Sequence, residues 1–209
     1  MKEDRRLFSV NVNDEEIEEA ERLIKELRRN YINARQVFEI KLSHGAKIPK
    51  RNFPTDAGLD LEIRGYQIPQ SKEPCWFDEE SPHDHSGTLF INPGQRLLIK
   101  TGIQIAIPPC PEPEFVYEMQ VRPRSGLALK KGLTILNSPG TIDANYRGDI
   151  GVILHNSGDS PVLLSVGDKI AQLVISKVFV GETFKVVGEF SQETDRGLDG
   201  FGSSDNSKR

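Results

Sequence analysis

The sequence has no long apolar run. None of its hydrophobic stretches approaches the roughly 20 residues that a membrane-spanning helix needs. Its first residues, Met1 to Arg6, are charged and lead into no apolar segment, so we expect no secretory signal. Lysine and arginine total 27 against 31 aspartates and glutamates, and the resulting net charge of -4 disfavours a large nucleic-acid-binding surface. We therefore expect neither a membrane partner nor a stable nucleic-acid partner.

Cysteine is also scarce. The two cysteines, Cys75 and Cys110, make no disulfide framework, which favours a reducing, cytoplasmic setting. The glycine-rich loop G-x-x-x-x-G-K-[ST], the turn G-x-G-x-x-G, the zinc motif H-E-x-x-H and the C-x-x-C pair are all absent. If the chain binds a nucleotide, it must do so with other residues.

Residues 13–34 contain no Gly or Pro and carry dense charge. Their apolar side chains recur at spacings of three and four: Ile17, Ala20, Ile24, Leu27, Tyr31 and Ala34. This spacing predicts one apolar stripe on an α-helix, which would form an N-terminal extension over residues 1–36. The simpler interpretation is a helix that packs on its own domain. The alternative is a helix that docks on a partner or another subunit.

From residue 37 to residue 190, short β-rich runs alternate with turns that Gly and Pro mark. We expect strands at Val37–Leu42, Leu59–Ile63, Arg96–Ile99, Ile103–Ile107, Phe115–Val121, Ile150–His155, Val162–Val166, Ile170–Ile175 and Phe184–Val187. Many short strands at close spacing are typical of an all-β sandwich or barrel. One β domain is therefore predicted over residues 37–190.

Two segments depart from this pattern. Residues 67–87 are polar, contain three prolines and predict a long surface insertion. Possible metal ligands within it are Cys75, His83, Asp84 and His85. A zinc site needs about four converging ligands at regular spacing, so we expect a solvated loop instead. Residues 191–209 are rich in Gly and Ser, and they predict a flexible tail.

The segment Arg122-Pro-Arg-Ser-Gly-Leu-Ala has the chemistry of an anion site. Arg124 has a planar guanidinium that matches phosphate oxygens. Ser125 adds a hydroxyl, and Gly126 lets backbone N–H groups approach an anion closely. The alternative for this segment is a plain turn.

The segment Asn137-Ser-Pro-Gly-Thr-Ile-Asp-Ala-Asn-Tyr-Arg-Gly-Asp brings together an amide, a carboxylate and a phenol. Asp143 could deprotonate a water, Asn137 could pair with a base edge, and Tyr146 could stack on a sugar. The alternative is a tight turn. In the tail, Phe201 offers a flat face for stacking, and Ser203 and Ser204 could contact phosphates. The alternative for the tail is a disordered terminus.

These segments resemble the trimeric dUTP pyrophosphatases (dUTPases) over about residues 38–204. The family's five motifs occur in order: Asp56-Ala-Gly-Leu-Asp-Leu, Pro123-Arg-Ser-Gly-Leu-Ala, Gly140-Thr-Ile-Asp-Ala-Asn-Tyr-Arg-Gly-Asp, Gly167-Asp-Lys-Ile-Ala-Gln-Leu-Val and Arg196-Gly-Leu-Asp-Gly-Phe-Gly-Ser-Ser. The resemblance implies a distorted β-barrel or jelly roll with an added N-terminal helix. It also implies hydrolysis of dUTP to dUMP and pyrophosphate, which controls the dUTP level and supplies dUMP for thymidylate synthesis.

The resemblance assigns roles by position. Asp143 would be the general base, and Tyr146 would lie under the deoxyribose and exclude a 2′-hydroxyl. Uracil would be read by Asn137 with the backbone of Thr141 and Ile142, and Phe201 would stack on it. Phosphates would be held by Arg124, Ser125, Gly126, Gln172, Arg196, Gly202, Ser203 and Ser204. Asp60 would contact Mg²⁺ only through water, and three subunits of a homotrimer would share each site.

The chain departs from the family pattern at Asp199 and Asp205, where glycines are usual, and in the helix and the 67–87 insertion. An added carboxylate near a triphosphate would repel it. One alternative function is that of a non-catalytic nucleotide-sensing or interaction protein. Another is dCTP deamination. The dCTP deaminases resemble this chain in part, but they need a glutamate where Ile153 stands, and isoleucine cannot transfer protons.

Overall fold

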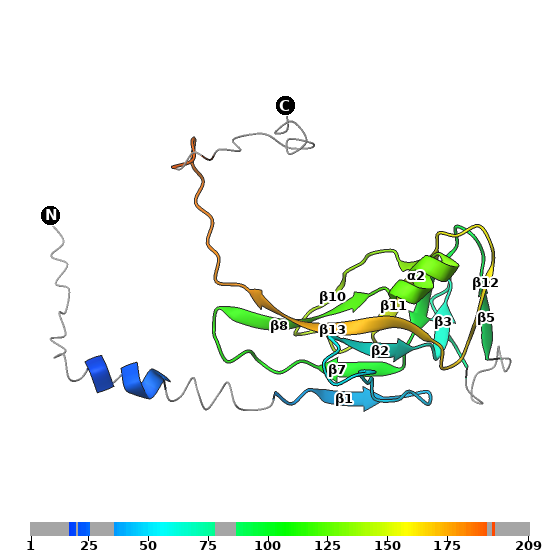
Figure 1. Cartoon of the computed structure of the whole chain (residues 1–209), viewed down its shortest axis with the longest axis horizontal. Helices are drawn as coiled ribbons and strands as arrows, with labels where there is room; N and C mark the ends of the chain where they lie inside the picture. Colours follow the sequence, from blue (N-terminus) through cyan, green and yellow to red (C-terminus); the bar gives the residue numbers. More distant parts are fainter. Residues whose placement is uncertain (1–16, 20, 26–35, 78–86, 192–193, 195–209) are drawn as a thin grey trace.

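A computed structural model of the chain describes residues 17–19, 21–25, 36–77, 87–191 and 194, and β-strands dominate it (Figure 1). The elements of the β body are, in chain order, β1 Glu39–Leu42, β2 Gly58–Glu62, β3 Gly65–Gln67, β4 Cys75–Trp76, β5 Thr88–Ile91, β6 Arg96–Lys100, β7 Ile103–Ala106, β8 Phe115–Arg122, α2 Ser125–Lys131, β9 Leu133–Ile135, β10 Gly140–Ile142, β11 Gly151–Asn156, β12 Val162–Ser165 and β13 Lys169–Phe179. The expected all-β class is confirmed.

The strands form antiparallel sheets of small size. Their orders are β10-β8-β13-β2, β4-β3-β6-β11-β9, β1-β7 and β12-β5. The longest pairing joins β8 to β13 and runs from Arg122 opposite Gln172 to Phe115 opposite Phe179. Strands far apart in the sequence are therefore neighbours, and this places the first, second and fourth motifs around one sheet.

Alternating side chains of these strands build the core. In β11, Val152 and Leu154 are at most 1% exposed, and in β6 the same holds for Leu97 and Ile99. Successive side chains of a strand point to opposite faces, so this period of two is what a half-buried sheet requires. Burial of each such side chain contributes about 1.5–3 kcal/mol.

The segment after β8 is a helix, and the plain turn considered for it is wrong. Once past Gly126, the residues Leu-Ala-Leu-Lys-Lys have high helix propensity. Gly132 ends α2 in the left-handed region at φ 65°, and its N–H donates to the Ala128 carbonyl at 3.2 Å. Lys130 and Lys131 lie in the last turn, where the helix dipole favours cations.

The expected 67–87 loop contains a strand. Cys75–Trp76 forms β4 and pairs with β3, with Trp76 opposite Gly65. Residues 78–86, which include His83, Asp84 and His85, lie outside the described residues. The short strands β5, β9 and β10 were not expected either, because runs of three or four residues between turns give little periodicity.

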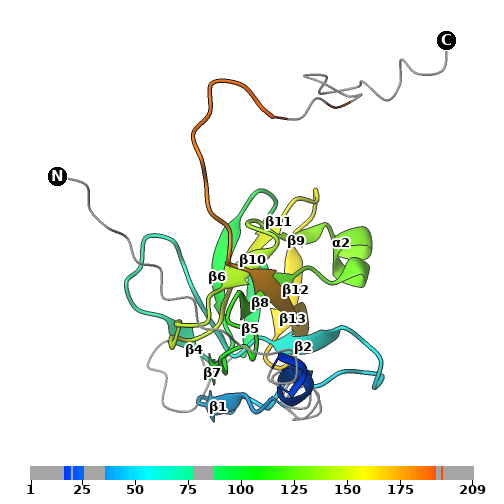
Figure 2. The same cartoon turned by 90° about the vertical axis from the view of Figure 1, so that its left-hand side faces the viewer.

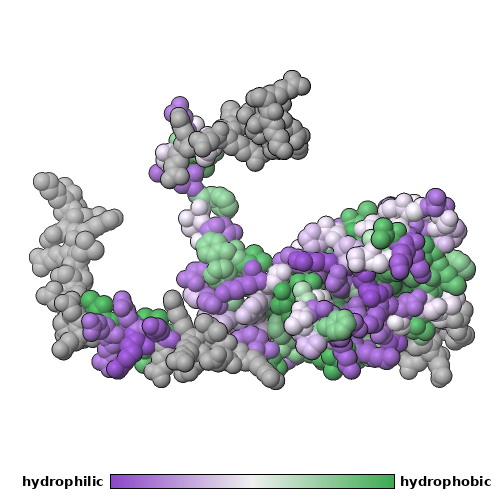
Figure 3. Space-filling view, in the orientation of Figure 1, coloured by the Kyte–Doolittle hydropathy of each residue, from purple (hydrophilic) through white to green (hydrophobic). Residues whose placement is uncertain are grey.

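The expected strand at Phe184–Val187 is wrong. This segment is extended and leaves the β body after β13, as the two perpendicular views show (Figures 1 and 2). Phe184 is 92% exposed and Val186 is 98% exposed, and Figure 3 shows hydrophobic surface along this arm. Alternating apolar residues are present here, but no neighbouring strand among the described residues pairs with them.

The N-terminal segment is helical at residues 17–19 and 21–25, and all of these residues are exposed. Ile17 and Ile24, on the expected apolar stripe, are 45% and 50% exposed. The described part of this helix therefore does not pack on its own domain, so the simpler interpretation fails there. None of the helices described in this chain is both long and apolar enough to cross a membrane.

Candidate active site

A cleft of about 620 Å³ opens between β2, α2 and the start of β13. Its charged lining comprises the cations Arg124, Lys130, Lys131 and Lys169 and the carboxylates Asp56 and Asp60. Four cations against two carboxylates favour an anionic ligand. The cleft also brings together the expected residues Ser125, Gly126 and Gln172, which come from two motifs separated by 46 positions or more along the chain.

Asp60 lies at the centre of the charged groups. Lys169 Nζ is 2.7 Å from its Oδ2, and Arg124 Nε is 3.3 Å from its Oδ1. Arg124 Nη1 also donates to the Lys169 carbonyl at 3.0 Å. These contacts orient the guanidinium, and Arg has five N–H donors in all. Its remaining donors can therefore serve a phosphate.

Gln172 is held at the floor of the cleft. The β-ladder places it opposite Asp60 on one side and Arg122 on the other. Its Nε2 donates to the Pro123 carbonyl at 2.9 Å. A Cβ added at Gly58 would lie 2.2 Å from Gln172 Oε1, so only glycine leaves room for this amide.

The first turn of α2 supplies the opposite wall. Ser125 and Gly126 are exposed there, and a Cβ added at Gly126 would meet nothing within 4 Å. The first N–H groups of a helix have no partner within the helix and can donate to an anion. Arg124 precedes the helix in extended backbone, which aims its side chain across the cleft at Asp60.

The expected base, sugar and water contacts lie outside the lining of the cleft, although β10 belongs to the same sheet as β2 and β13. Asn137 follows β9, Thr141 and Ile142 belong to β10, and Asp143 and Tyr146 lie in the turn before β11. None of the five lines the cleft. All except Ile142 are exposed. One chain therefore brings together the expected phosphate contacts but not the expected nucleoside contacts.

Tyr146 has a defined position within its turn. Its hydroxyl donates to the Asp149 carbonyl at 3.0 Å, and its N–H donates to the Asp143 carbonyl at 3.0 Å. A Cβ added at Gly148 would lie 2.4 Å from the phenol oxygen, so the ring lies directly on this glycine. The tail residues Arg196, Phe201, Gly202, Ser203 and Ser204 lie outside the described residues.

Lys169 is a site residue to which the sequence analysis assigned no role. It lies inside the fourth motif, three positions before Gln172, so a lysine at the start of a strand beside Gly-Asp was the available signal. Its contact with Asp60 depends on the β2–β13 pairing, which the sequence does not reveal. Among the described residues no group of three or more His, Cys, Asp or Glu side chains could hold a metal.

A second titratable cluster lies elsewhere, where the C-terminal arm leaves β13. Lys177 Nζ is 2.8 Å from Glu112 Oε1, and this hydrogen bond lowers the pKa of Glu112 and raises that of Lys177. Burial raises the pKa of Tyr117. None of these residues lines the cleft.

Comparison with known proteins places these features in one family. The sequence profile of the dUTPase family matches residues 84–205, more than half of the chain. The deoxyuridine 5'-triphosphate nucleotidohydrolase of Chlamydia pneumoniae is 45% identical over 162 residues, 78% of this chain and 93% of the relative. The enzyme of the same name from Heliobacterium modesticaldum is 42% identical over 165 residues, again 78% and 93%.

Solved structures agree with the sequence relatives. The dUTPase of Staphylococcus bacteriophage 80alpha, solved with dUpNHpp, is 26% identical, with a TM-score of 0.61 and coverage of 80% of this chain and 97% of the phage chain. A phage phi11 dUTPase variant, which coordinates a structural Mg(II) ion, shares the fold at 24% identity and a TM-score of 0.55, with coverage of 75% and 99%. This chain belongs to the dUTPase family.

Proposed function

We propose that this chain hydrolyses dUTP to dUMP and pyrophosphate by attack of water on the α-phosphorus. One observation carries the proposal: Arg124, Gln172 and the first turn of α2 converge on a net-positive cleft. The relatives that match most of this chain are named for the same reaction. No described feature favours deamination, since Ile153 lies within β11 opposite Leu98 and cannot transfer a proton.

The cleft residues would bind the triphosphate. Arg124 would form paired hydrogen bonds with phosphate oxygens, and the N–H groups at Ser125 and Gly126 would donate to the same chain of oxygens. Gln172 would add an amide donor from the floor. Positioning and charge neutralisation account for most catalysis in phosphoryl-type transfer, so these contacts are expected to affect both binding and turnover.

The donor chemistry of the cleft fits a Mg²⁺ that binds together with the substrate. Mg²⁺ prefers oxygen ligands, retains several waters and is usually bound by one or two carboxylates plus phosphates. Asp60 supplies one such carboxylate, but Lys169 and Arg124 already contact it, which suits a contact through water. Bound in this way, Mg²⁺ would neutralise phosphate charge.

The turn between β10 and β11 would complete the site. Asp143 would accept a proton from the attacking water, a contribution worth about 10²–10⁴-fold in rate. Tyr146 would lie under the deoxyribose. Asn137, together with the backbone of Thr141 and Ile142, would pair with the uracil edge.

The tail would cover the bound nucleotide. Phe201 would stack on uracil, while phosphate contacts would come from Arg196, Gly202, Ser203 and Ser204. A segment that closes over substrate also excludes bulk water. The tail from residue 191, the 1–36 extension and the cytoplasmic location remain predictions.

A homotrimer would unite the two groups of residues. The separation of Asp143 and Tyr146 from the cleft within one chain supports this proposal, because each chain would offer its exposed turn to a cleft on its neighbour. The third chain would contribute the tail.

The deciding experiment is a pyrophosphate-release assay with Mg²⁺ and dUTP, dTTP, dCTP or UTP, run beside light scattering. We expect a trimer with strong preference for dUTP, because a site built to pair with one base edge leaves buried polar groups unpaired with another. A fully active monomer would contradict the shared site, and comparable kcat/KM for dUTP and UTP would contradict the role of Tyr146.

A further inference from the structure

A mostly buried ion pair lies behind the turn that carries Asp143 and Tyr146. Lys100 Nζ is 3.0 Å from Asp149 Oδ2, and the two side chains are 15% and 16% exposed. This oxygen is buried and has no aligned hydrogen-bond donor among the described residues. The Lys100 charge is therefore its main compensation, and a buried carboxylate without such compensation is costly.

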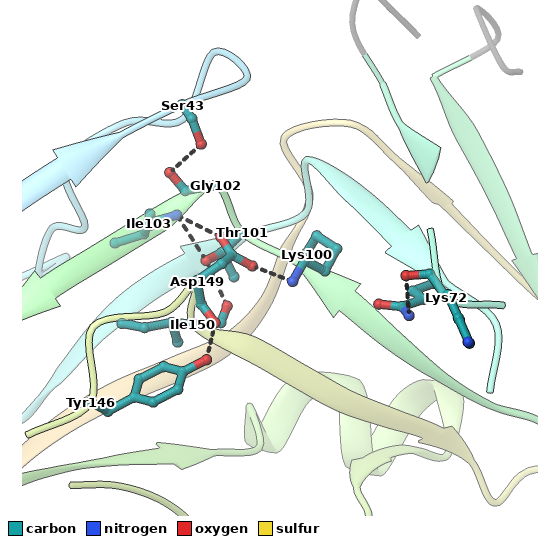
Figure 4. Close-up of polar contacts among 10 residues, drawn as sticks. Ser43, Lys72, Lys100, Thr101, Gly102, Ile103, Tyr146, Asp149 and Ile150 are labelled. Atoms are coloured by element: carbon teal, nitrogen blue, oxygen red, sulfur yellow. Dashed lines mark hydrogen bonds and ion pairs between the residues drawn. The ribbon is translucent and has the colours of Figure 1, made fainter. Parts of the chain in front are cut away.

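The same pair fixes the end of the turn to the rest of the molecule (Figure 4). Asp149 Oδ1 accepts the Ile103 N–H at 3.0 Å. The Ile150 carbonyl accepts the hydroxyl of Thr101 at 2.7 Å, and Thr101 is fully buried. Three contacts thus hold Asp149 and Ile150 against β6, β7 and the residues that join them.

Tyr146 depends on this anchor directly. The acceptor of its hydroxyl is the backbone carbonyl of Asp149, so the phenol is tied to the residue that Lys100 holds. Its N–H is tied to Asp143 at the other end of the turn. A shift of Asp149 would therefore move both the phenol of Tyr146 and the carboxylate of Asp143.

Trp76 of the insertion lies beside the lysine of this ion pair. Trp76, in β4, has its ring centroid 5.9 Å from Lys100 Nζ, and the ring stacks on that of His44 at a centroid distance of 3.7 Å and an interplanar angle of 9°. Gly65 lies opposite both Trp76 and Lys100 in the sheet. A Cβ added there would lie 2.5 Å from the Cys75 carbonyl oxygen and 3.0 Å from the indole, so glycine allows β4 and its tryptophan to approach β3 this closely.

We propose that Lys100 is a positioning residue for Tyr146 and that Trp76 of the 67–87 insertion is its cover. Lys100 holds Asp149, Asp149 holds the phenol, and the indole keeps water away from the ion pair, which strengthens the attraction. This inference rests on the proposed role of Tyr146 in excluding ribose. It assigns a purpose to an insertion that has no counterpart in the minimal family pattern.

The test compares kcat/KM for dUTP and UTP in the full-length protein with Lys100→Met, Lys100→Arg, Trp76→Ala, Trp76→Phe and Tyr146→Ala. Lys100→Met and Trp76→Ala should lower the preference for dUTP by about tenfold or more, since a displacement of about 1 Å can cost up to about 10²-fold. Lys100→Arg and Trp76→Phe should retain most of the preference for dUTP. These substitutions leave the phosphate cleft unchanged. KM for dUTP should therefore change less than the ratio of kcat/KM for dUTP to kcat/KM for UTP.

Lys177→Met is the matched control. It also removes a lysine that pairs with a carboxylate, at 2.8 Å, and lies 4.1 Å from a phenylalanine ring, but its partner is Glu112 and not Asp149. It should leave the dUTP/UTP ratio unchanged.

Trp76 is the single tryptophan, so its fluorescence reports the cover without a label. Lys100→Met should alter its emission in a folded protein, and Trp76→Ala tests the cover without removing charge if Lys100→Met fails to fold. If the lysine and tryptophan variants fold, lose stability and keep the wild-type ratio while Tyr146→Ala loses it, the positioning role is wrong and the proposed function stands. If Tyr146→Ala also keeps the ratio, the role of Tyr146 and this inference both fail.

Discussion

The substitution Gly126→Ala tests whether position 126 needs glycine for ligand binding and not for the fold. In the structure a Cβ at position 126 meets nothing within 4 Å, and no positive φ requires glycine there. Glycine costs a helix interior about 1 kcal/mol relative to alanine, and in the first turn we take about 0.5 kcal/mol. The alanine variant should therefore melt about 1–2 °C higher in a chain of this size.

The same methyl group should harm binding. If the N–H groups at Ser125 and Gly126 approach the phosphates as proposed, a methyl at this wall keeps the phosphates away. The loss of one hydrogen bond to a charged group, about 1.5–3 kcal/mol, corresponds to about 10–100-fold in KM for dUTP. Steady-state pyrophosphate release and differential scanning fluorimetry measure the two effects on one sample.

Gly58→Ala is the comparison. Its methyl would lie 2.2 Å from Gln172 Oε1, an overlap of about 1 Å against an ordinary C···O contact. The β-ladder with Val174 prevents the backbone from moving away. This variant should lose about 1–3 kcal/mol of stability as well as activity. If Gly126→Ala keeps a normal KM with its assembly intact by light scattering, close approach of the phosphates to α2 is refuted.

Asp143→Asn should keep the trimer and most dUTP binding but lose about 10²–10⁴-fold in kcat, because an amide cannot accept the proton; near-normal kcat would place the base elsewhere. Deletion of residues 195–209 should leave the melting temperature unchanged and remove most activity, and full-length turnover by the truncated chain would end the tail hypothesis. Asp199→Gly should bind dUTP as well or better by calorimetry, since it removes a negative charge near the phosphates, and markedly weaker binding would contradict this. Thr101→Val should leave the Ile150 carbonyl unpaired at a cost of about 2 kcal/mol, or roughly 4–8 °C in Tm; an unchanged Tm would show that this hydrogen bond contributes little to stability.

The periodicity of the sequence predicted most strands because their burial follows local rules. In β11, alternating Val152 and Leu154 reach the core, and the predicted Ile150–His155 overlaps the observed strand. At Phe184–Val187 the same pattern failed, because a strand also needs a partner to receive its backbone hydrogen bonds. Periodicity detects one face of a strand and carries no information about a neighbour.

The site was predictable only as a set of residue types. The motifs identified Arg124 and Gln172, but nothing local places Lys169 at 2.7 Å from Asp60, since that contact follows from the β2–β13 register. The helical geometry at Gly126 was hidden for a related reason. A glycine interrupts the local sequence pattern in the same way whether it starts a turn or lies in the first turn of a helix.

The exposure of Asp143 and Tyr146 explains why assembly would matter for chemistry and not only for stability. Electrostatic interactions are weak in water and strong where water is excluded, so a general base open to solvent gains little from a cation nearby. In the proposed trimer, the neighbour's cleft would cover the turn, and the charges of Arg124 and Lys169 would act across a drier gap. The turn must then arrive in one defined geometry without contacts from its own cleft. The Lys100–Asp149 pair provides that rigidity within each chain before any neighbour docks.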